Sequence, residues 1–272
     1  MAHTNFKDRN VLITGGASGI GKLMGREVLQ RGAKLIIWDR DAEAMEATAA
    51  ELAALGPVVR QRVDVTERAA VQAAYLELKT QQGPVDILIN SAGIVTGNKF
   101  FQDIGSDEID RTMAVNAVAP MHVARVVLPD MVARNQGHLC IIASAASLIG
   151  NPRMAVYAAS KWAAMGWSES LRIEMKEQRL DIGVTTVAPY YISTGMFAGV
   201  RSPLVPILKP DKVVRRIIRG IERRRSIVSM PWPVGFVRLM QAVLPQAIFD
   251  LVVGRWMGIY HTMDRFTGRA KP

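Results

Sequence analysis

Tyr157, Lys161 and Ser144 have the residue types and the spacing needed for acid–base chemistry on an alcohol. Tyr157 and Lys161 form a Tyr-x-x-x-Lys pair, and Ser144 lies thirteen residues before the tyrosine. In a helix, residues four apart lie on one face, so both side chains of the pair would reach the same cleft. A Tyr-x-x-x-Lys pair alone is usually a surface feature, and only its combination with other site residues indicates catalysis.

Oxidising an alcohol requires a base that takes the hydroxyl proton while hydride leaves the carbon atom. Tyrosine has a pKa of about 10 and is a poor base at neutral pH, but a cation beside it favours the phenolate and lowers that pKa. We therefore predict that Tyr157 is the acid/base and that Lys161 lowers its pKa. The hydroxyl of Ser144 would hold the substrate oxygen.

A glycine-rich segment near the N-terminus predicts that the hydride partner is a dinucleotide. The segment Thr14-Gly15-Gly16-Ala17-Ser18-Gly19-Ile20-Gly21 follows an apolar run and opens a helical pattern. Gly15 permits a tight turn, small residues let the backbone approach a pyrophosphate, and Gly21 lets the helix pack closely on the sheet. The helix N-terminus then offers unpaired N–H groups to the phosphates. The residues expected to bind the cofactor here are Gly15, Ser18, Gly19, Ile20 and Gly21.

Asp39 indicates which dinucleotide is bound. It ends the second apolar run, 24 residues after Gly15. An acidic side chain at this point accepts hydrogen bonds from the ribose 2′-hydroxyl and repels a 2′-phosphate, so we predict NAD rather than NADP. Arg40 would partly offset that repulsion, and we place it with Asp39 among the cofactor-binding residues. Alternatively, Asp39 has no role in cofactor binding and caps the helix that follows.

Short apolar runs alternate with amphipathic helical patterns along the chain as far as Met230. The predicted strands are 10–14, 34–39, 58–63, 85–89, 137–143, 182–187 and 227–230, and the predicted helices are 20–29, 41–54, 67–82, 107–134, 157–178 and 211–225. Apolar strands that alternate with helices are typical of a parallel sheet covered on both faces. We predict an α/β fold with a single doubly wound Rossmann domain of seven parallel strands over residues 1–230. Residues 231–272 would form an apolar and basic C-terminal extension.

Together these motifs resemble the short-chain dehydrogenase/reductase family over nearly the whole length to Met230. The residues that carry the resemblance are the glycine-rich segment, Asp64, Asn90-Ser91-Ala92-Gly93, Asn116, Ser144, Tyr157-Ala158-Ala159-Ser160-Lys161 and Pro189 to Thr194. The resemblance implies that Asn116 joins the catalytic set of Ser144, Tyr157 and Lys161 in a proton relay through the lysine and water. The further cofactor contacts that it implies are Asp64 and Val65, Asn90, Ala92 and Gly93, Pro189, Ile192 and Thr194, and Tyr157 and Lys161 themselves. Family members are commonly dimeric or tetrameric, which implies a homodimer or a homotetramer.

Two positions depart from the family pattern. Ser91 stands where a second asparagine is frequent, and we expect this small polar residue to have little effect. Tyr190 stands where the family usually has a glycine after proline. Because glycine permits positive φ and tyrosine disfavours it, we expect the loop after Pro189 to be set differently.

The segment after this proline favours an apolar substrate. Residues 190–208 should form a substrate lid rich in Tyr, Met, Phe, Leu and Pro, with Arg201 as its one charged residue. Pockets of this composition suit hydrophobic ligands better than sugars or small polyols. The apolar lid, the tail and the sequence around Trp38-Asp39 make the chain most similar to the branch that contains retinol and hydroxysteroid dehydrogenases.

The positive charge of the chain lies in its last quarter. The formal net charge is +10, and residues 209–272 hold 13 Lys and Arg residues against four Asp and Glu residues. Between Pro231 and Tyr260 the charged residues are only Arg238, Asp250 and Arg255, yet no uninterrupted apolar stretch is long enough to span a bilayer. Two roles for residues 231–272 stay open. In the first role, the segment covers the substrate entrance or a subunit interface. In the second, it makes a peripheral membrane contact, with Arg223 to Arg225 near anionic lipid.

Other side chains limit the remaining possibilities. The single cysteine, Cys140, lies in an apolar run and is expected to be a buried structural thiol, so no intrachain disulfide can form. The four histidines are scattered without metal-ligand spacing, and we expect no metal site. The polar N-terminus has no signal-peptide pattern, which predicts a cytoplasmic protein, peripherally bound to a membrane if the tail makes that contact.

We therefore expect an NAD-dependent oxidoreductase that transfers hydride to or from a hydrophobic alcohol or ketone of the steroid, retinoid or long-chain kind. The first alternative is an NADP-linked ketoreductase of a biosynthetic pathway, against which Asp39 argues. The second is a non-catalytic nucleotide- or nucleic-acid-binding protein, suggested by the sequence pI of about 10.0. The basic residues of helix 211–225 lie opposite its apolar residues, which is more typical of a solvated or lipid-facing side, so we expect no nucleic acid.

Overall fold

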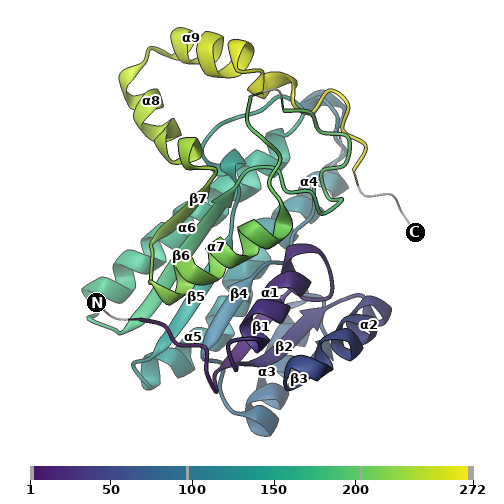
Figure 1. Cartoon of the computed structure of the whole chain (residues 1–272), viewed down its shortest axis with the longest axis vertical. Helices are drawn as coiled ribbons and strands as arrows, with labels where there is room; N and C mark the ends of the chain where they lie inside the picture. Colours follow the sequence, from purple (N-terminus) through teal and green to yellow (C-terminus); the bar gives the residue numbers. More distant parts are fainter. Residues whose placement is uncertain (1–2, 96–97, 203, 269–272) are drawn as a thin grey trace.

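Seven parallel strands form one continuous sheet in the computed structural model, which describes residues 3–95, 98–202 and 204–268. Figure 1 shows the strands side by side, with helices on both sides of them. The strands are β1 Asn10–Thr14, β2 Lys34–Asp39, β3 Val58–Arg62, β4 Ile87–Asn90, β5 Gly137–Ile142, β6 Ile182–Pro189 and β7 Ile227–Met230. The helices that cover the sheet are α1 Gly19–Leu29, α2 Ala42–Leu52, α3 Arg68–Gln82, α4 Ser106–Met113, α5 Ala119–Ala133, α6 Ala155–Glu177 and α7 Pro210–Glu222. The predicted doubly wound α/β fold is confirmed.

The strand order places the candidate chemistry at one edge of the sheet. The order is β3-β2-β1-β4-β5-β6-β7, so the chain reverses its direction of travel across the sheet between β1 and β4. Loops at the carboxyl ends of neighbouring strands diverge at such a reversal and leave a crevice there. The glycine-rich segment follows β1, and Ser144 follows β5. Both therefore lie at the edge where ligands bind in sheets of this kind.

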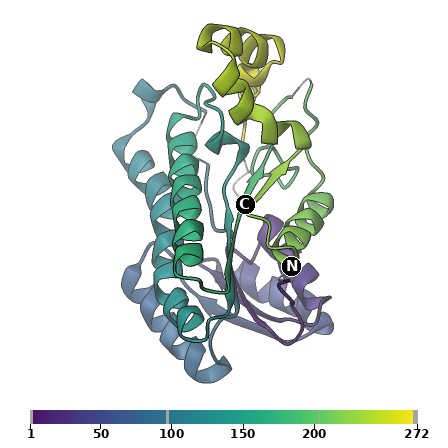
Figure 2. The same ribbon diagram turned by 90° about the vertical axis from the view of Figure 1, so that its left-hand side faces the viewer.

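The two faces of the sheet are buried in two separate apolar clusters. One cluster joins α1, α2 and α7 to the sheet, and the other joins α3, α5 and α6. Figure 2 shows these two layers on opposite sides of the strands. In β1, Val11 and Ile13 face the first cluster while Leu12 faces the second, as the alternation of side chains along a strand requires. Cys140 of β5 is buried in the first cluster, which confirms the prediction of a buried thiol.

The predicted helix 107–134 is interrupted, which the sequence analysis missed. α4 ends at Met113, a π-helical turn covers Ala114–Val118, and α5 begins at Ala119. Pro120 has no N–H to donate to the carbonyl of Asn116 four residues earlier, so a regular α-helix cannot be completed at this point. Such turns are frequent at functional sites, and this one holds Asn116. The other predicted helices and strands begin and end within about three residues of those observed, which is the usual uncertainty of element ends.

The chain beyond β7 folds into short helices at the carboxyl edge of the sheet. They are α8 Val237–Val243 and α9 Gln246–Phe249, followed by a π-helical turn over Asp250–Trp256. Figures 1 and 2 show α8 and α9 standing out from the body of the molecule at one end. In the described ranges, no helix combines the length and the apolar character that crossing a membrane requires. The division into a domain 1–230 and an extension 231–272 stays a prediction, and residues 269–272 lie outside the described part.

Candidate active site

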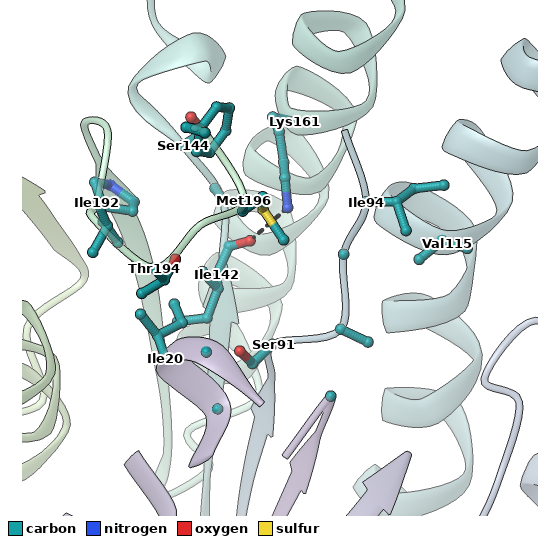
Figure 3. A pocket seen from close by; sticks show the side chains of 18 of the residues that line it. Ile20, Ser91, Ile94, Val115, Ile142, Ser144, Lys161, Ile192, Thr194 and Met196 are labelled. Carbon is teal, nitrogen blue, oxygen red and sulfur yellow. Dashed lines mark hydrogen bonds between the residues drawn. The ribbon is translucent and has the colours of Figure 1, made fainter. Parts of the chain in front are cut away.

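A cleft of about 430 Å³ opens at the carboxyl edge of the sheet. Its walls come from the glycine-rich segment, the ends of β2, β4, β5 and β6, the start of α6 and the loop after Pro189. Figure 3 shows Ile20 and Ser91 at one end of this cleft and Ser144 at the other, with Thr194 and Met196 between them on the loop after β6. The predicted residues that line it are Gly15, Ser18, Gly19, Ile20, Gly21, Asp39, Arg40, Asp64, Val65, Ala92, Gly93, Ser144, Tyr157, Lys161, Pro189, Ile192 and Thr194.

The glycine-rich segment has no room for side chains where it turns from β1 into α1. Gly15 has φ of +66°, and a Cβ there would lie 2.8 Å from the Cα of Ala92. A Cβ on Gly21 would lie 2.1 Å from the carbonyl oxygen of Gly15, so only glycine fits. Thr48 of α2 holds the turn from outside by donating to the carbonyl of Ala17 at 2.7 Å. Bare backbone at a helix N-terminus is the surface that a pyrophosphate requires, so these residues fit a dinucleotide.

Asp39 at the end of β2 points its carboxylate into the cleft rather than capping α2. Its Oδ2 accepts from the backbone N–H of Ala17 at 3.1 Å, and its Oδ1 accepts from that of Asp41 at 3.2 Å. The cap of α2 is Asp41, whose side chain accepts from the N–H of Ala44 at 3.0 Å. The alternative role of Asp39 as a helix cap is therefore excluded. Asp39 is left as the acidic group beside the glycine-rich segment.

Asp64 and Arg40 lie beside Asp39 at the same end of the cleft. Burial by itself would raise the pKa of Asp64, but two hydrogen bonds from Thr66 and the nearby guanidinium of Arg40 lower it below its usual value. The hydrogen bonds are 3.0 Å from the backbone N–H and 2.7 Å from the hydroxyl of Thr66. Asp64 is therefore a fixed anion, with the guanidinium of Arg40 near it.

Tyr157 and Lys161 lie on the face of α6 that borders the cleft, and both side chains are 5 % exposed. The Nζ atom of Lys161 lies 5.8 Å from the centre of the Tyr157 ring and donates to the carbonyl oxygen of Ile142 at 2.9 Å. Figure 3 shows this hydrogen bond and Lys161 pointing into the cleft. Ser144 begins the turn after β5, where its Oγ accepts from the N–H of Ala146 at 3.1 Å. The three residues are thus brought together from β5 and α6.

The pKa of Tyr157 is raised in this structure, and not lowered as expected. Burial is the largest influence and raises the pKa of Tyr157 to about 12, while its hydrogen bond with Ser144 acts in the opposite direction. Lys161 is buried as well, and loss of hydration lowers the pKa of its ammonium group to about 8. Because both groups are removed from water, the charged form of each is disfavoured.

Asn116 and Asn90 are the two predicted site residues that do not line the cleft. The side chain of Asn116 accepts from the N–H of Ile94 at 2.8 Å and donates to its carbonyl at 2.9 Å and to the Oγ of Ser160 at 3.1 Å. Asn90 donates to the carbonyl of Pro120 at 3.2 Å. Each side chain fixes backbone behind the cleft wall, and the expected roles of Asn116 in a proton relay and of Asn90 in cofactor binding stay predictions. Asn116 positions Ile94, which does line the cleft.

The loop after Pro189 adopts ordinary backbone geometry at Tyr190. Tyr190 is not among the residues with positive φ. Its N–H donates to the carbonyl of Met230 at 2.8 Å and its hydroxyl lies 3.0 Å from Ser202 Oγ. Tyrosine is therefore accommodated without strain, and the ring of Tyr190 packs edge-on against Tyr191, with 4.6 Å between ring centres. Ser91, the other departure, lines the cleft, and its N–H is held by the hydroxyl of Thr14 at 3.1 Å.

A polar cluster from the C-terminal segment completes the cleft, and the sequence analysis missed it. Asn151, which lines the cleft, donates to Tyr191 Oη at 3.0 Å and to Thr262 Oγ1 at 2.8 Å. The hydroxyls of Tyr191 and Thr262 are 2.9 Å apart, and that of Thr262 donates to the carbonyl of Ile259 at 2.9 Å. Ile259 itself lines the cleft. No local pattern marks these residues, because they meet only after the tail folds back over the loop at 190–197.

Comparison with known proteins decides the family. The family model described as short chain dehydrogenase matches residues 9–204. The chain belongs to the short-chain dehydrogenase/reductase family. Among curated relatives of this dehydrogenase, mouse epidermal retinol dehydrogenase 2 is 37% identical over 98% of the chain and 88% of the relative. Estradiol 17-beta-dehydrogenase 11 of Pongo abelii is 32% identical over 90% of the chain and 85% of the relative.

A solved structure supports the cofactor of this short-chain dehydrogenase. A short-chain dehydrogenase/reductase from Burkholderia phymatum in complex with NAD superposes with a TM-score of 0.80 and 26% identity, over 93% of this chain and 97% of that one. The bare glycine turn and the carboxylate of Asp39 beside it fit the same cofactor. The protein is an NAD-dependent oxidoreductase that acts on a small molecule, as predicted. The described residues contain no group of three or more His, Cys, Asp or Glu side chains arranged to hold a metal ion.

Proposed function

We propose that this dehydrogenase transfers hydride between NAD(H) and a hydrophobic alcohol or ketone of the steroid, retinoid or long-chain kind. The observation that carries the proposal is the apolar half of the cleft next to Tyr157. Its walls are Ile149, Met154, Tyr191, Met196, Phe197 and Ile259. The ring of Phe197 lies edge-on to Tyr157, with 5.9 Å between ring centres. Such a wall offers a sugar or a polyol few hydrogen-bond partners but contacts a large apolar body well. The names of the retinol and estradiol dehydrogenases among the relatives agree with this class.

In this proposal Tyr157 is the acid/base. During oxidation its phenolate oxygen accepts the hydroxyl proton of the substrate, and during reduction its hydroxyl donates a proton to the carbonyl oxygen of the ketone. Ser144 Oγ donates a hydrogen bond to that same oxygen and holds it beside Tyr157. The ammonium group of Lys161, 5.8 Å from the centre of the Tyr157 ring, opposes the effect of burial by favouring the phenolate. Asn116 keeps the loop at Ile94 in place. When bound, NAD(H) accepts the hydride in oxidation and supplies it in reduction.

Replacing the acid/base tests the mechanism. Tyr157→Phe removes the hydroxyl and keeps the ring that packs on Phe197, so turnover should be abolished while NAD affinity is kept. The measurements are NADH formation with graded alkanols, retinol and steroids, and NAD binding by calorimetry. Wild-type rates in the variant would refute the proposed role of Tyr157. Comparing kcat/KM for NADH and NADPH tests the role of Asp39, and a preference for NADPH would refute it.

We further propose a homodimer or a homotetramer and a peripheral contact with a membrane. The exposure of Trp162 and Ile173 on α6 supports the homo-oligomer. The exposed apolar surface of residues 232–256 supports the membrane contact. Light scattering coupled to size-exclusion chromatography measures the mass in solution, and a monomer would refute the first proposal. Recovery of the full chain in the cytosol without any membrane-bound fraction would refute the second.

A further inference from the structure

The side chain of Asn151 has an unpaired hydrogen-bond acceptor. Asn151 lines the cleft, and its Oδ1 atom is buried without a hydrogen-bond partner among the described residues. A buried acceptor without a donor is unfavourable, and most buried polar groups in folded proteins have a partner. An exception on a residue that lines a ligand-binding cleft indicates that the bound ligand supplies the donor.

The surrounding hydrogen bonds decide that the unpaired atom is the oxygen of the amide and not its nitrogen. The hydroxyl of Thr262 donates its one hydrogen to the carbonyl of Ile259 at 2.9 Å, so Thr262 Oγ1 only accepts from its other neighbours. The Asn151 atom that lies 2.8 Å from Thr262 Oγ1 is therefore the donor Nδ2. The second hydrogen of Nδ2 is donated to Tyr191 Oη at 3.0 Å. Both donors of the amide are used, and an acceptor is left.

The partners of Asn151 also prevent its amide from turning round. Because the hydrogen of Thr262 is donated elsewhere, Tyr191 is the donor between their two hydroxyls, which are 2.9 Å apart. Burial raises the pKa of Tyr191, so its hydroxyl keeps this hydrogen at neutral pH. Turning the amide round would place Oδ1 against two oxygens whose hydrogens are already donated to other atoms. Tyr191 and Thr262 are both buried, which holds the arrangement in place.

Asn151 lies in the half of the cleft that would hold the substrate. Its hydrogen-bond partner Tyr191 packs against the ring of Phe197, with 5.1 Å between ring centres. The same ring packs against Tyr157 on α6, with 5.9 Å between ring centres. Because both tyrosines contact one ring, Asn151 lies near the reacting group but several bonds away from a carbon atom that reacts at Tyr157.

The surroundings of Asn151 select a neutral donor. The carboxylates among the described residues that line the cleft are Asp39, Asp41 and Asp64, which belong to its glycine-rich end. An ammonium group beside Asn151 would thus be removed from water without a counter-ion, which is far more costly than burying a hydroxyl with one hydrogen bond. A hydroxyl is neutral and has one hydrogen to donate, so it matches the single unpaired acceptor.

We propose that Asn151 determines substrate specificity, because its Oδ1 atom accepts a hydrogen bond from a second hydroxyl group on the apolar body of the substrate. The favoured substrate is then a hydrophobic diol or hydroxyketone, with one oxygen at Tyr157 and the other at Asn151. An alcohol with a single oxygen leaves the acceptor unpaired. Tyr191 and Thr262 act as positioning residues that orient the amide. This role of Asn151 rests on the proposed function, since such diols are a class within the hydrophobic alcohols and ketones.

Matched substrates test the specificity on the wild-type enzyme. Each linear α,ω-diol of a graded series is compared with its monomethyl ether, whose far oxygen accepts hydrogen bonds but donates none. At the chain length that reaches Asn151, kcat/KM per reactive hydroxyl should be about tenfold higher for the diol, which corresponds to about 1.4 kcal/mol. An ω-amino alcohol of that length should show no such gain. Equal values for diol and ether at every length would overturn the proposal.

Replacing Asn151 separates recognition of the substrate from support of the cleft wall. Asn151→Leu removes the amide and keeps a side chain of similar size, so the preference for the diol over the ether should disappear. A purely structural role would lower the rates of both substrates together and leave their ratio unchanged, contrary to the proposal. Asn5→Leu is the matched control, because Asn5 is exposed and its Oδ1 accepts from the N–H of Lys7 at 3.0 Å. This variant should keep the ratio of the wild type.

Calorimetric titration of the NADH-bound enzyme with the same diol and ether measures recognition without turnover, since NADH cannot take up a hydride. Tighter binding of the diol, lost in Asn151→Leu, would support the role of Asn151 even in an enzyme that oxidises no hydrophobic alcohol, and the proposed function alone would then fail. Turnover of hydrophobic alcohols without a preference for the diol in kinetics or in binding would leave the proposed function standing and overturn the role of Asn151.

Discussion

The hydroxyl of Thr262 ties the C-terminal segment to the active-site cleft, and its removal should damage substrate binding without affecting NAD. Thr262 is fully buried, and Thr262→Val keeps its shape while removing the oxygen. That oxygen takes part in three hydrogen bonds, to Asn151, Tyr191 and the carbonyl of Ile259. The variant therefore leaves a buried amide and a buried carbonyl without these partners.

The cost can be worked from these contacts. A buried hydrogen bond contributes about 1 kcal/mol net, so the loss of three should lower the free energy of unfolding by about 3 kcal/mol. Part of this loss should appear as loosening of the segment that carries Ile259 across the cleft. We expect kcat/KM for a long-chain alcohol to fall about tenfold, which corresponds to about 1.4 kcal/mol, mainly through KM. The glycine-rich segment lies elsewhere, so the Kd for NAD should stay the same.

Three measurements on the same preparations check these effects. Denaturant unfolding gives the free energy of unfolding, steady-state kinetics gives kcat/KM and KM, and calorimetry gives the Kd for NAD. Thr80→Val is the matched control, because Thr80 also donates to a backbone carbonyl, that of Leu76 at 2.9 Å, but on the exposed side of α3. Its removal should cost less than about 0.5 kcal/mol. Unchanged KM for the long-chain alcohol in Thr262→Val would refute the reasoning, as would an equal weakening of NAD and substrate binding.

Three further predictions concern pH and the cofactor turn. The hydrogen bond from Ser144 lowers the pKa of Tyr157, so Ser144→Ala should move the rising limb of the oxidation kcat/KM profile to higher pH, and a shift to lower pH would contradict this role. Gly21→Ala places a Cβ against the carbonyl of Gly15 and should raise the NAD Kd by about tenfold or more, with a loss of about 1–3 kcal/mol of stability in thermal unfolding. Burial lowers the pKa of His138 to about 3, so the unfolded chain binds a proton below pH of about 6.5 and the folded chain does not. Stability should therefore decrease by about 2 kcal/mol between pH 6.5 and 5, and His138→Asn should remove that part of the slope.

The sequence was sufficient wherever a feature depends on neighbours in the chain. Alternating apolar strands and amphipathic helices predicted the seven-stranded sheet, since each strand must bury both faces. The glycine turn was predicted because the tight turn from β1 into α1 leaves no room for a Cβ at Gly21. The Tyr157–Lys161 pair was predicted because four residues make about one turn of a helix. These are properties of local geometry, and the tertiary structure leaves them intact.

The tertiary structure alone decided the properties that depend on distant residues. The pKa of Tyr157 depends on how far the folded chain excludes water, and the sequence predicted the wrong direction. The motif placed Asn116 in the site, but only the fold shows that its side chain also hydrogen-bonds to Ile94 and Ser160, which are 22 and 44 residues away. The contact of Asn151 with Thr262 joins residues 111 apart. Desolvation and long-range hydrogen bonds arise only when the chain has closed on itself, and no pattern within a few residues encodes them.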